Sequence, residues 1–247
     1  MKTACLIIIG NEVLSGRTQD LNLAFLGGRL NDIGVRMTEA RVIPDVTDTI
    51  IDTVNACRPN FDYVFTTGGI GPTHDDITSH AIAQAFGVPL YRHPDAVAAM
   101  RRHYSKDAEL KLNEQRLKMC DVPEGAELID NPISKAPGYR MENVFVFAGI
   151  PKIMQVMFEG MKESLVGGPP MLSRTVVAYM GEGTLAAGLG DIQNDYPMVE
   201  IGSYPFFRAG KFGSSLVMRS LDAAANDRAT EAVKQLVRGL GAEPEEE

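Results

Sequence analysis

A glycine-rich run that ends in two adjacent carboxylates is the stretch of this sequence best suited to chemistry. Residues 66–76 read TTGGIGPTHDD, after an apolar segment at residues 63–65 and before a segment of helical spacing at residues 77–86. A strand, a glycine-rich turn and a helix in this order place backbone N–H groups where an anion can bind. Asp75 and Asp76 would repel a phosphate there unless a divalent cation lay between them. The turn therefore predicts a metal-assisted phosphate site.

The residues of this turn suggest separate roles. The glycines Gly68, Gly69 and Gly71 would let the backbone approach a pyrophosphate, and Thr73 would add a hydroxyl group. Asp76 stands at the predicted helix start, where capping the helix and binding a metal are both open roles. The turn lacks the Gly-Lys-Ser/Thr ending of a nucleotide triphosphatase loop, so it predicts a different kind of phosphate site.

Alternating strand and helix signals surround the turn and predict an α/β fold. Apolar runs predict strands, and helical periodicity with glycine or proline at the ends predicts helices. The strands are expected at residues 4–9, 35–43, 63–66 and 143–147, and the helices at residues 21–33, 46–57, 77–86, 94–119 and from Pro151 onward. This order predicts a doubly wound, mostly parallel sheet.

A proline- and glycine-rich segment at residues 166–170 predicts a boundary between two parts. We expect an α/β domain at residues 1–168 and a small α+β module at residues 169–241. The last residues, 242–247, are expected to form a disordered acidic tail.

Acidic residues follow three successive strands of the predicted sheet. They are Glu12 after the first strand, Asp45 after the second, and Asp75 with Asp76 in the glycine turn. Because open parallel sheets bind ligands beyond the carboxyl ends of their strands, we expect these carboxylates to share one ligand or metal site.

Composition narrows the classes of partner. The net charge is −8 without a concentrated basic stretch, so nucleic acid is not expected to bind. A polar helical face predicts either a solvated surface or a basic rim for an anionic ligand; its cations are Arg101, Arg102, His103, Lys106, Lys111, Arg116 and Lys118. No apolar run is long enough to predict a membrane span. Three scattered cysteines are expected to be reduced thiols of a cytoplasmic protein, neither zinc ligands nor disulfide partners.

Four clusters together resemble the molybdopterin-binding (MoaB/MogA-like) domain family in its CinA-type form. They are Gly10-Asn11-Glu12, Pro44-Asp45, residues 68–76, and Asn131-Pro132 with Ala136-Pro137-Gly138. The resemblance covers residues 3–166 and implies a MogA-like three-layer αβα fold. The remainder resembles the small KH-like module of CinA proteins, and residues 201–205 resemble relatives of the amino-terminal half of eukaryotic FAD synthases.

The resemblance implies metal-dependent hydrolysis of a nucleotide pyrophosphate of the ADP-ribose or FAD class. By motif, it implies catalytic roles for Asp45 and Asp76. The ligands implied for Mg²⁺, Mn²⁺ or Co²⁺ are Asp45, Asp75, Asp76 and Glu12. The residues implied to bind phosphate or ligand are Gly68, Gly69, Gly71, Thr73, Asn131 and Gly138.

Two other functions remain open, and both use a small-molecule ligand. One is a molybdopterin-binding or adenylylating protein, and the other is a non-catalytic nucleotide-binding scaffold; we expect a homo-oligomer in each case. Three positions depart from the family pattern: Asn11 replaces Thr or Asp, Ala148 replaces Pro, and Ile153 replaces Glu. The last change removes a carboxylate near the expected site and bears on whether the site is catalytic.

Overall fold

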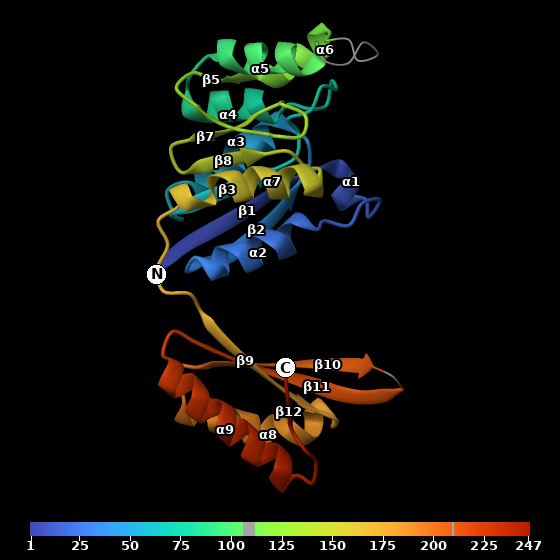
Figure 1. Ribbon diagram of the computed structural model, residues 1–247, viewed down its shortest axis with the longest axis vertical. Coiled ribbons are helices and arrows are strands. Elements are labelled where there is room, and N and C mark those ends of the chain that lie inside the picture. Colours follow the sequence, from blue (N-terminus) through green and yellow to red (C-terminus); the bar gives the residue numbers. More distant parts are fainter. Residues whose placement is uncertain (106–111, 209) are drawn as a thin grey trace. The chain divides into compact units, whose positions relative to one another are not determined.

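The computed structural model describes residues 1–105, 112–208 and 210–247 and divides the chain into two compact units (Figure 1). The first unit is Met1–Gly168 and the second is Pro169–Glu247. Two cations of the predicted basic face, Lys106 and Lys111, lie outside the described residues.

Within the described residues, the first unit is built on a six-stranded sheet with the order β2-β1-β3-β8-β7-β6. The strands are β1 (Lys2–Ile9), β2 (Val35–Ile43), β3 (Tyr63–Thr67), β6 (Glu127–Ile129), β7 (Gly138–Met141) and β8 (Val144–Phe147). Strands β2, β1, β3 and β8 are parallel, whereas β7 runs antiparallel to both of its neighbours. The predicted doubly wound, mostly parallel sheet is confirmed.

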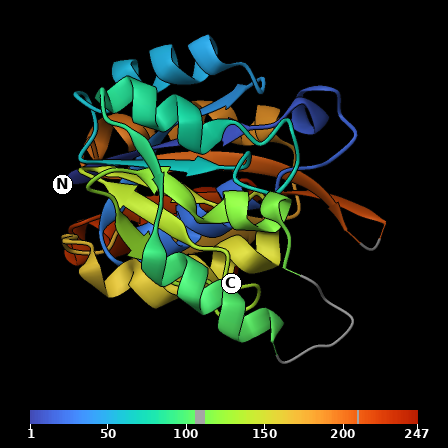
Figure 2. The same cartoon turned by 90° about the horizontal axis from the view of Figure 1, so that it is seen from above.

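Helices cover both faces of this sheet and give the three-layer αβα arrangement. Helices α3 and α4 pack against one face through Ile50, Val54 and Ile82, and α2 and α7 pack against the other through Leu30 and Phe158. Figure 2 shows α3 and α4 on the opposite side of the sheet from α7. The helices of this unit are α1 (Asn11–Leu14), α2 (Asn22–Asp32), α3 (Thr47–Cys57), α4 (Thr78–Phe86), α5 (Pro94–Tyr104), α6 (Glu114–Leu117) and α7 (Pro151–Met161), with 3₁₀ turns η1 (Lys118–Cys120) and η2 (Lys162–Ser164).

The helix predicted at residues 94–119 is wrong as a single element. It divides into α5, α6 and η1, because Asn113 caps a new helix by accepting the Arg116 N–H at 2.9 Å. A short two-stranded sheet, β4 (Leu90–Arg92) with β5 (Asp121–Pro123), joins the two ends of the segment that contains these helices. The ion pair of Arg92 with Asp121 crosses the pair of strands.

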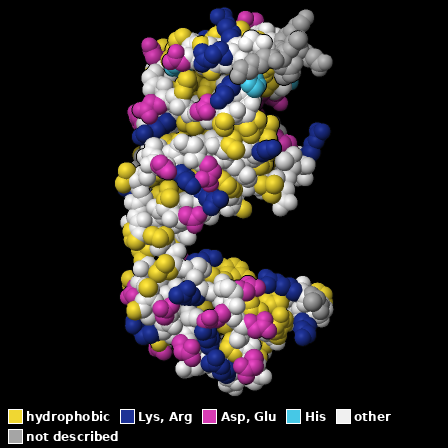
Figure 3. Space-filling model, viewed as in Figure 1, with side chains coloured by type: hydrophobic (Ala, Val, Ile, Leu, Met, Phe, Trp, Pro, Cys, Tyr) yellow, Lys and Arg dark blue, Asp and Glu magenta, His cyan; other side chains and the backbone are white. Residues whose placement is uncertain are grey.

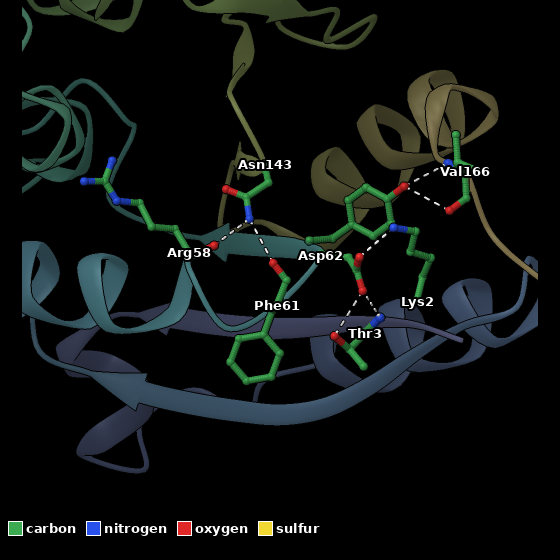
Figure 4. Close-up of polar contacts among 8 residues, drawn as sticks. Lys2, Thr3, Arg58, Phe61, Asp62, Asn143 and Val166 are labelled. Atoms are coloured by element: carbon green, nitrogen blue, oxygen red, sulfur yellow. Dashed lines mark hydrogen bonds and ion pairs between the residues drawn. The ribbon is translucent and has the colours of Figure 1, made fainter.

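Polar contacts fasten the end of the sheet at which β1 and β3 begin (Figure 4). Asp62 accepts hydrogen bonds from Lys2 Nζ at 2.6 Å and from the Thr3 N–H at 2.8 Å. The Tyr63 hydroxyl donates to the Val166 carbonyl and accepts the Val166 N–H, both at 2.9 Å. The amide of Asn143 donates to the carbonyls of the segment between α3 and β3. These contacts therefore fix the end of the sheet at which β1 and β3 begin, and the glycine turn lies at the other end of β3.

In its described part, the second unit is a four-stranded antiparallel sheet, ordered β10-β11-β9-β12, with two helices packed on it. Its elements are β9 (Leu172–Ala178), α8 (Glu182–Asp195), β10 (Glu200–Arg208), β11 (Lys211–Ser220), α9 (Ala223–Gly239) and β12 (Glu245–Glu246). The predicted small α+β module is thus present.

The prediction of a disordered tail at residues 242–247 is wrong. Strand β12 pairs with the edge strand β9, Glu246 forms an ion pair with Lys234, and Glu247 forms one with Arg208. The acidic residues are ordered because basic side chains and an open strand edge accept them. On the face in Figure 3, acidic and basic side chains are interspersed and no basic patch extends across the described part of either unit.

Candidate functional site

A cleft of about 440 Å³ opens where β1, β3 and β8 end. Its lining comes from segments far apart in the sequence. These residues are Glu12, Gly68, Gly69, Ile70, Gly71, Pro72, Asp76, Met119, Asn131, Ser134, Ala136, Ala148, Gly149, Ile150 and Ile153. The structure thus brings Glu12, the glycine turn, Asp76 and Asn131 to one place, as the sheet topology requires.

The first two glycines of the turn adopt a backbone that other residues rarely do. Gly68 has φ +103° and Gly69 has φ +67°. A Cβ on Gly68 would lie 2.1 Å from the carbonyl oxygen of Ile9, and a Cβ on Gly69 would lie 2.1 Å from Thr78 Oγ1. Only glycine satisfies both the conformation and the contact.

Buried Thr78 at the start of α4 holds this turn from beneath. Its N–H donates to the Gly69 carbonyl at 2.9 Å, and its hydroxyl donates to the Gly68 carbonyl at 3.0 Å. Within the described residues, the N–H groups of Gly69, Ile70 and Gly71 donate no hydrogen bond inside the protein. Three unpaired donors in the wall of a cleft suit the oxygens of a phosphate.

Thr73 links the two carboxylates of the turn. Its hydroxyl lies 2.5 Å from Asp75 Oδ1 and 2.5 Å from Asp76 Oδ2, and its N–H donates to Asp76 Oδ2 at 2.7 Å. Because the hydroxyl has one hydrogen, it donates to only one of the two carboxylates at a time. The two acidic side chains therefore lie close together and share a single hydroxyl donor. The Thr73 hydroxyl lowers the pKa of Asp75, and the backbone N–H of Asp75 lowers it further. The charges of His74 and Lys118 act in the same direction.

Asp76 does not cap α4. The residue at the helix cap is Ile77, without a side-chain hydrogen bond, whereas Asp76 folds back onto Thr73 and beside Gly71. Of the two roles left open for Asp76, helix capping is therefore excluded, and its carboxylate stays in the wall of the cleft.

The remaining predicted residues lie outside the cleft lining. Asp45 accepts the Asn11 N–H at 2.8 Å, and Thr73 and Asp75 lie on the exposed outer part of the turn. Gly138 is the first residue of β7, where a Cβ would meet the carbonyl oxygen of Val146 at 2.3 Å. The structure thus gathers Glu12 and Asp76 but not all four predicted metal ligands.

Asn131 has its amide committed to its own loop. It donates to Ser134 Oγ at 2.7 Å and to the Ala136 carbonyl at 2.8 Å, and its oxygen accepts the N–H groups of Ile133 and Ser134. This side chain shapes the loop that forms one wall of the cleft.

Three further residues shape the site: Asn22 and Thr78, which the sequence did not single out, and Lys118, which was named only as one cation of the polar helical face. Asn22 is buried and donates to the Gly149 carbonyl at 2.9 Å, which fixes the turn before α7. Lys118 donates to the Thr73 carbonyl at 2.6 Å, and its neighbour Met119 lines the cleft. Thr78, described above, is the third. No local motif marks them, because each acts through a contact distant in sequence.

The carboxylates of Glu12 and Asp76 are the acidic groups in the lining of the cleft, and they are the groups there that a divalent cation could use. Within the described residues, no group of three or more His, Cys, Asp and Glu side chains is placed to hold a metal alone. Mg²⁺ commonly binds one or two carboxylates together with waters and substrate phosphates. Glu12 and Asp76 supply two carboxylates, and among the residues that the structure describes no Lys or Arg lines the cleft. Ile153 lines the same cleft, so the carboxylate that it replaces would have belonged to this wall.

None of the described helices is both long and apolar enough to cross a membrane.

Comparison with known proteins finds a family model that matches each unit. The family described as "Probable molybdopterin binding domain" matches residues 5–167, and "FAD synthase, middle domain" matches residues 170–245. The second match confirms the resemblance seen at residues 201–205. A protein from Aeropyrum pernix is 34% identical over 262 residues, covering 99% of this chain and 97% of that protein.

Named relatives agree with this placement. A CinA-like protein of Salinibacter ruber is 35% identical over 77% of this chain, and a probable FAD synthase of Caenorhabditis briggsae is 28% identical over 96%. The chain spans about half the length of each, 48% and 50% respectively. The crystal structure of a CinA protein of unknown function from Thermoplasma acidophilum superposes with a TM-score of 0.61 at 34% identity, covering 66% of this chain and 97% of that one. The chain therefore belongs to the molybdopterin-binding domain family, in its MoaB/MogA-like, CinA-type form.

Proposed function

We propose that this protein hydrolyses a nucleotide pyrophosphate of the ADP-ribose or FAD class with the help of a divalent cation. The observation that carries the proposal is one cleft that combines the carboxylates of Glu12 and Asp76 with three N–H donors, at residues 69–71, that have no partner among the described residues. Donors alone would bind a phosphate, and carboxylates alone would repel it. Together they suit a phosphate that arrives with a cation.

Each group has a definite part in this reaction. Glu12 and Asp76 would hold Mg²⁺, Mn²⁺ or Co²⁺, which supplies charge neutralisation and a more acidic bound water. The N–H groups of Gly69, Ile70 and Gly71 would stabilise the charge that develops on the phosphate oxygens. A water oxygen attacks one phosphorus of the pyrophosphate, and the bond between that phosphorus and the bridging oxygen breaks. The products are AMP and either ribose 5-phosphate or FMN.

The protein's own contacts hold these groups in position. Thr78 fixes the carbonyls of Gly68 and Gly69, so the N–H groups that follow are held by the fold before a ligand arrives. Asp45 fixes the N–H of Asn11, next to Glu12, and we assign it this positioning role. The apolar side chains of Met119, Ile150 and Ile153 would pack against the rest of the nucleotide.

The family match supports a second candidate, a protein that binds or adenylylates molybdopterin. The same donors and carboxylates would then serve a pterin phosphate with ATP and Mg²⁺. A homo-oligomeric assembly and a cytoplasmic location are part of either proposal.

A metal-by-substrate screen separates these candidates. The full chain is incubated with ADP-ribose or FAD and with Mg²⁺, Mn²⁺ or Co²⁺, and AMP is quantified by chromatography. We expect AMP from at least one pair and loss of that activity in Asp76→Asn. No AMP under any condition, together with retention of molybdopterin from a competent lysate, would establish the second candidate. Absence of both, with nucleotide binding by calorimetry, would leave the scaffold, consistent with Ile153 in the cleft.

A further inference from the structure

Two of the three cysteines lie against each other in the core of the first unit. Cys5 Sγ on β1 and Cys57 Sγ at the end of α3 are 3.7 Å apart, although 52 positions separate them in the sequence. Both residues are fully buried, and both are free thiols. The sequence spacing predicted no pairing, and the packing of α3 on β1 produces it.

Among the residues that the structure describes, neither thiol has another reactive neighbour. Cys5 and Cys57 belong to the same apolar cluster, with Ile7, Val54 and Val64 around them. The nearby charged side chains, Glu39 and Arg41, form an ion pair with each other at 2.5 Å. Cys120 belongs to a separate cluster below α5. The chemical partner of each thiol in the pair is therefore the other.

We propose that Cys5 and Cys57 are a modification site, which hydrogen peroxide converts to an intramolecular disulfide that ties α3 to β1. The sulfur atoms must approach by roughly 1.7 Å to reach the bond length of about 2.0 Å. Each cysteine stands at a terminal or irregular point of its element. Cys57 is the last residue of α3, and the register of β1 with β2 shifts between Ala4 and Cys5.

The reaction has two steps. The Cys57 thiolate attacks one peroxide oxygen, the O–O bond breaks, and a sulfenic acid and hydroxide form. The Cys5 thiolate then attacks the Cys57 sulfur, the S–S bond forms, and the second hydroxide leaves. With the two thiol protons, both hydroxides become water, so two thiols and one peroxide give one disulfide and two waters.

Burial makes the first step slow at neutral pH. Desolvation raises the pKa of Cys57, and it raises that of Cys5 to about 12. The hydrogen bond from Cys5 and the charge of Arg41 oppose the rise at Cys57. The rate of disulfide formation therefore increases with pH, because the attacking group is a thiolate.

Thiol counting by mass spectrometry tests the proposal. The full chain is treated with peroxide, denatured and alkylated, then digested for peptide mapping. We expect three alkylated cysteines before oxidation, one afterwards at Cys120, and a peptide that links Cys5 to Cys57. The oxidised protein should have a higher Tm, because the bond closes a loop of about 50 residues in the unfolded chain, and dithiothreitol should reverse the shift.

Matched variants keep the test decisive. Cys120→Ala should form the same linked peptide, whereas Cys57→Ala should form none. Oxidation of Cys120 ahead of the pair, or sulfinic acid at Cys5 or Cys57 without a linked peptide, overturns the proposal. The wild-type peptide map answers the question even if Cys57→Ala does not fold.

Discussion

The Asp45 carboxylate accepts the backbone N–H of Asn11 at 2.8 Å and so joins the loop after β2 to the loop that carries Glu12. These loops follow neighbouring parallel strands, with Ile9 paired to Ile43 at their ends. The contact gives Asp45 a role in placing Glu12 that does not require Asp45 to touch a ligand.

Asp45 variants distinguish positioning from metal binding. Asp45→Asn keeps an oxygen that can accept the Asn11 N–H, whereas Asp45→Ala removes it. We expect Asp45→Asn to retain most AMP release and Asp45→Ala to lose roughly tenfold, because misplaced groups slow catalysis. Steady-state rates at saturating metal check this. Equal, large losses in both variants would instead indicate that Asp45 binds the metal.

The neighbouring carboxylates of the turn should differ in importance. Asp76 lines the cleft and Asp75 lies on the exposed side of Thr73. We expect Asp76→Asn to lower AMP release by about 100-fold or more, the scale for losing a group that stabilises the reacting charge. Asp75→Asn should lose less than about tenfold on the same scale. A larger loss in Asp75→Asn than in Asp76→Asn would contradict the placement of the site.

Two glycines with positive φ should respond differently to alanine. Gly87 ends α4 with φ +67° and has open space where a Cβ would be added, so Gly87→Ala should lose about 1–2 kcal/mol of unfolding free energy. Gly68→Ala adds a contact of 2.1 Å to the Ile9 carbonyl, which the sheet holds in place. Its loss should be clearly larger, as measured by urea unfolding. Similar losses would show that the turn shifts to accept a Cβ.

Acid should abolish the contribution of Asp62 to stability. The Lys2 ammonium, followed by the Thr3 N–H, lowers the pKa of Asp62 in the folded protein. A lowered carboxyl pKa stabilises the fold above the unfolded value, about 3.9, and this contribution disappears as the pH falls through the folded value. Asp62→Asn should therefore lower the Tm at pH 7, and the difference from wild type should shrink below about pH 4.

An exposed ion pair provides the control for Asp62. Asp130 forms an ion pair with Lys135 at 3.2 Å, and the Asp130 side chain is 74% exposed. Asp130→Asn should therefore change the Tm little at either pH. A Tm difference for Asp62→Asn that persists unchanged at pH 3 would contradict the electrostatic explanation.

Local patterns were sufficient for four of the six described strands of the main sheet, β1, β2, β3 and β8, whereas β6 and β7 were not predicted. Continuous apolar runs marked β1 and β3, and Gly87 marked the end of α4, because both signals depend on residues adjacent in the chain. The segment between α4 and β6 was less predictable. Its polar helical pattern did not reveal that Asn113 begins a new helix or that β4 pairs with β5.

The sequence by itself determined the α/β fold, the glycine turn and the presence of carboxylates after three successive strands. Tertiary structure alone decided which of these carboxylates line the cleft, since Asp45 turns to Asn11 while Asp76 remains beside Gly71. It also decided that Thr78 supports the turn, that the acidic tail pairs with β9, and that Cys5 meets Cys57. The reason is physical: residue type and spacing specify local backbone geometry, but side-chain partners distant in the chain are chosen only when the layers pack.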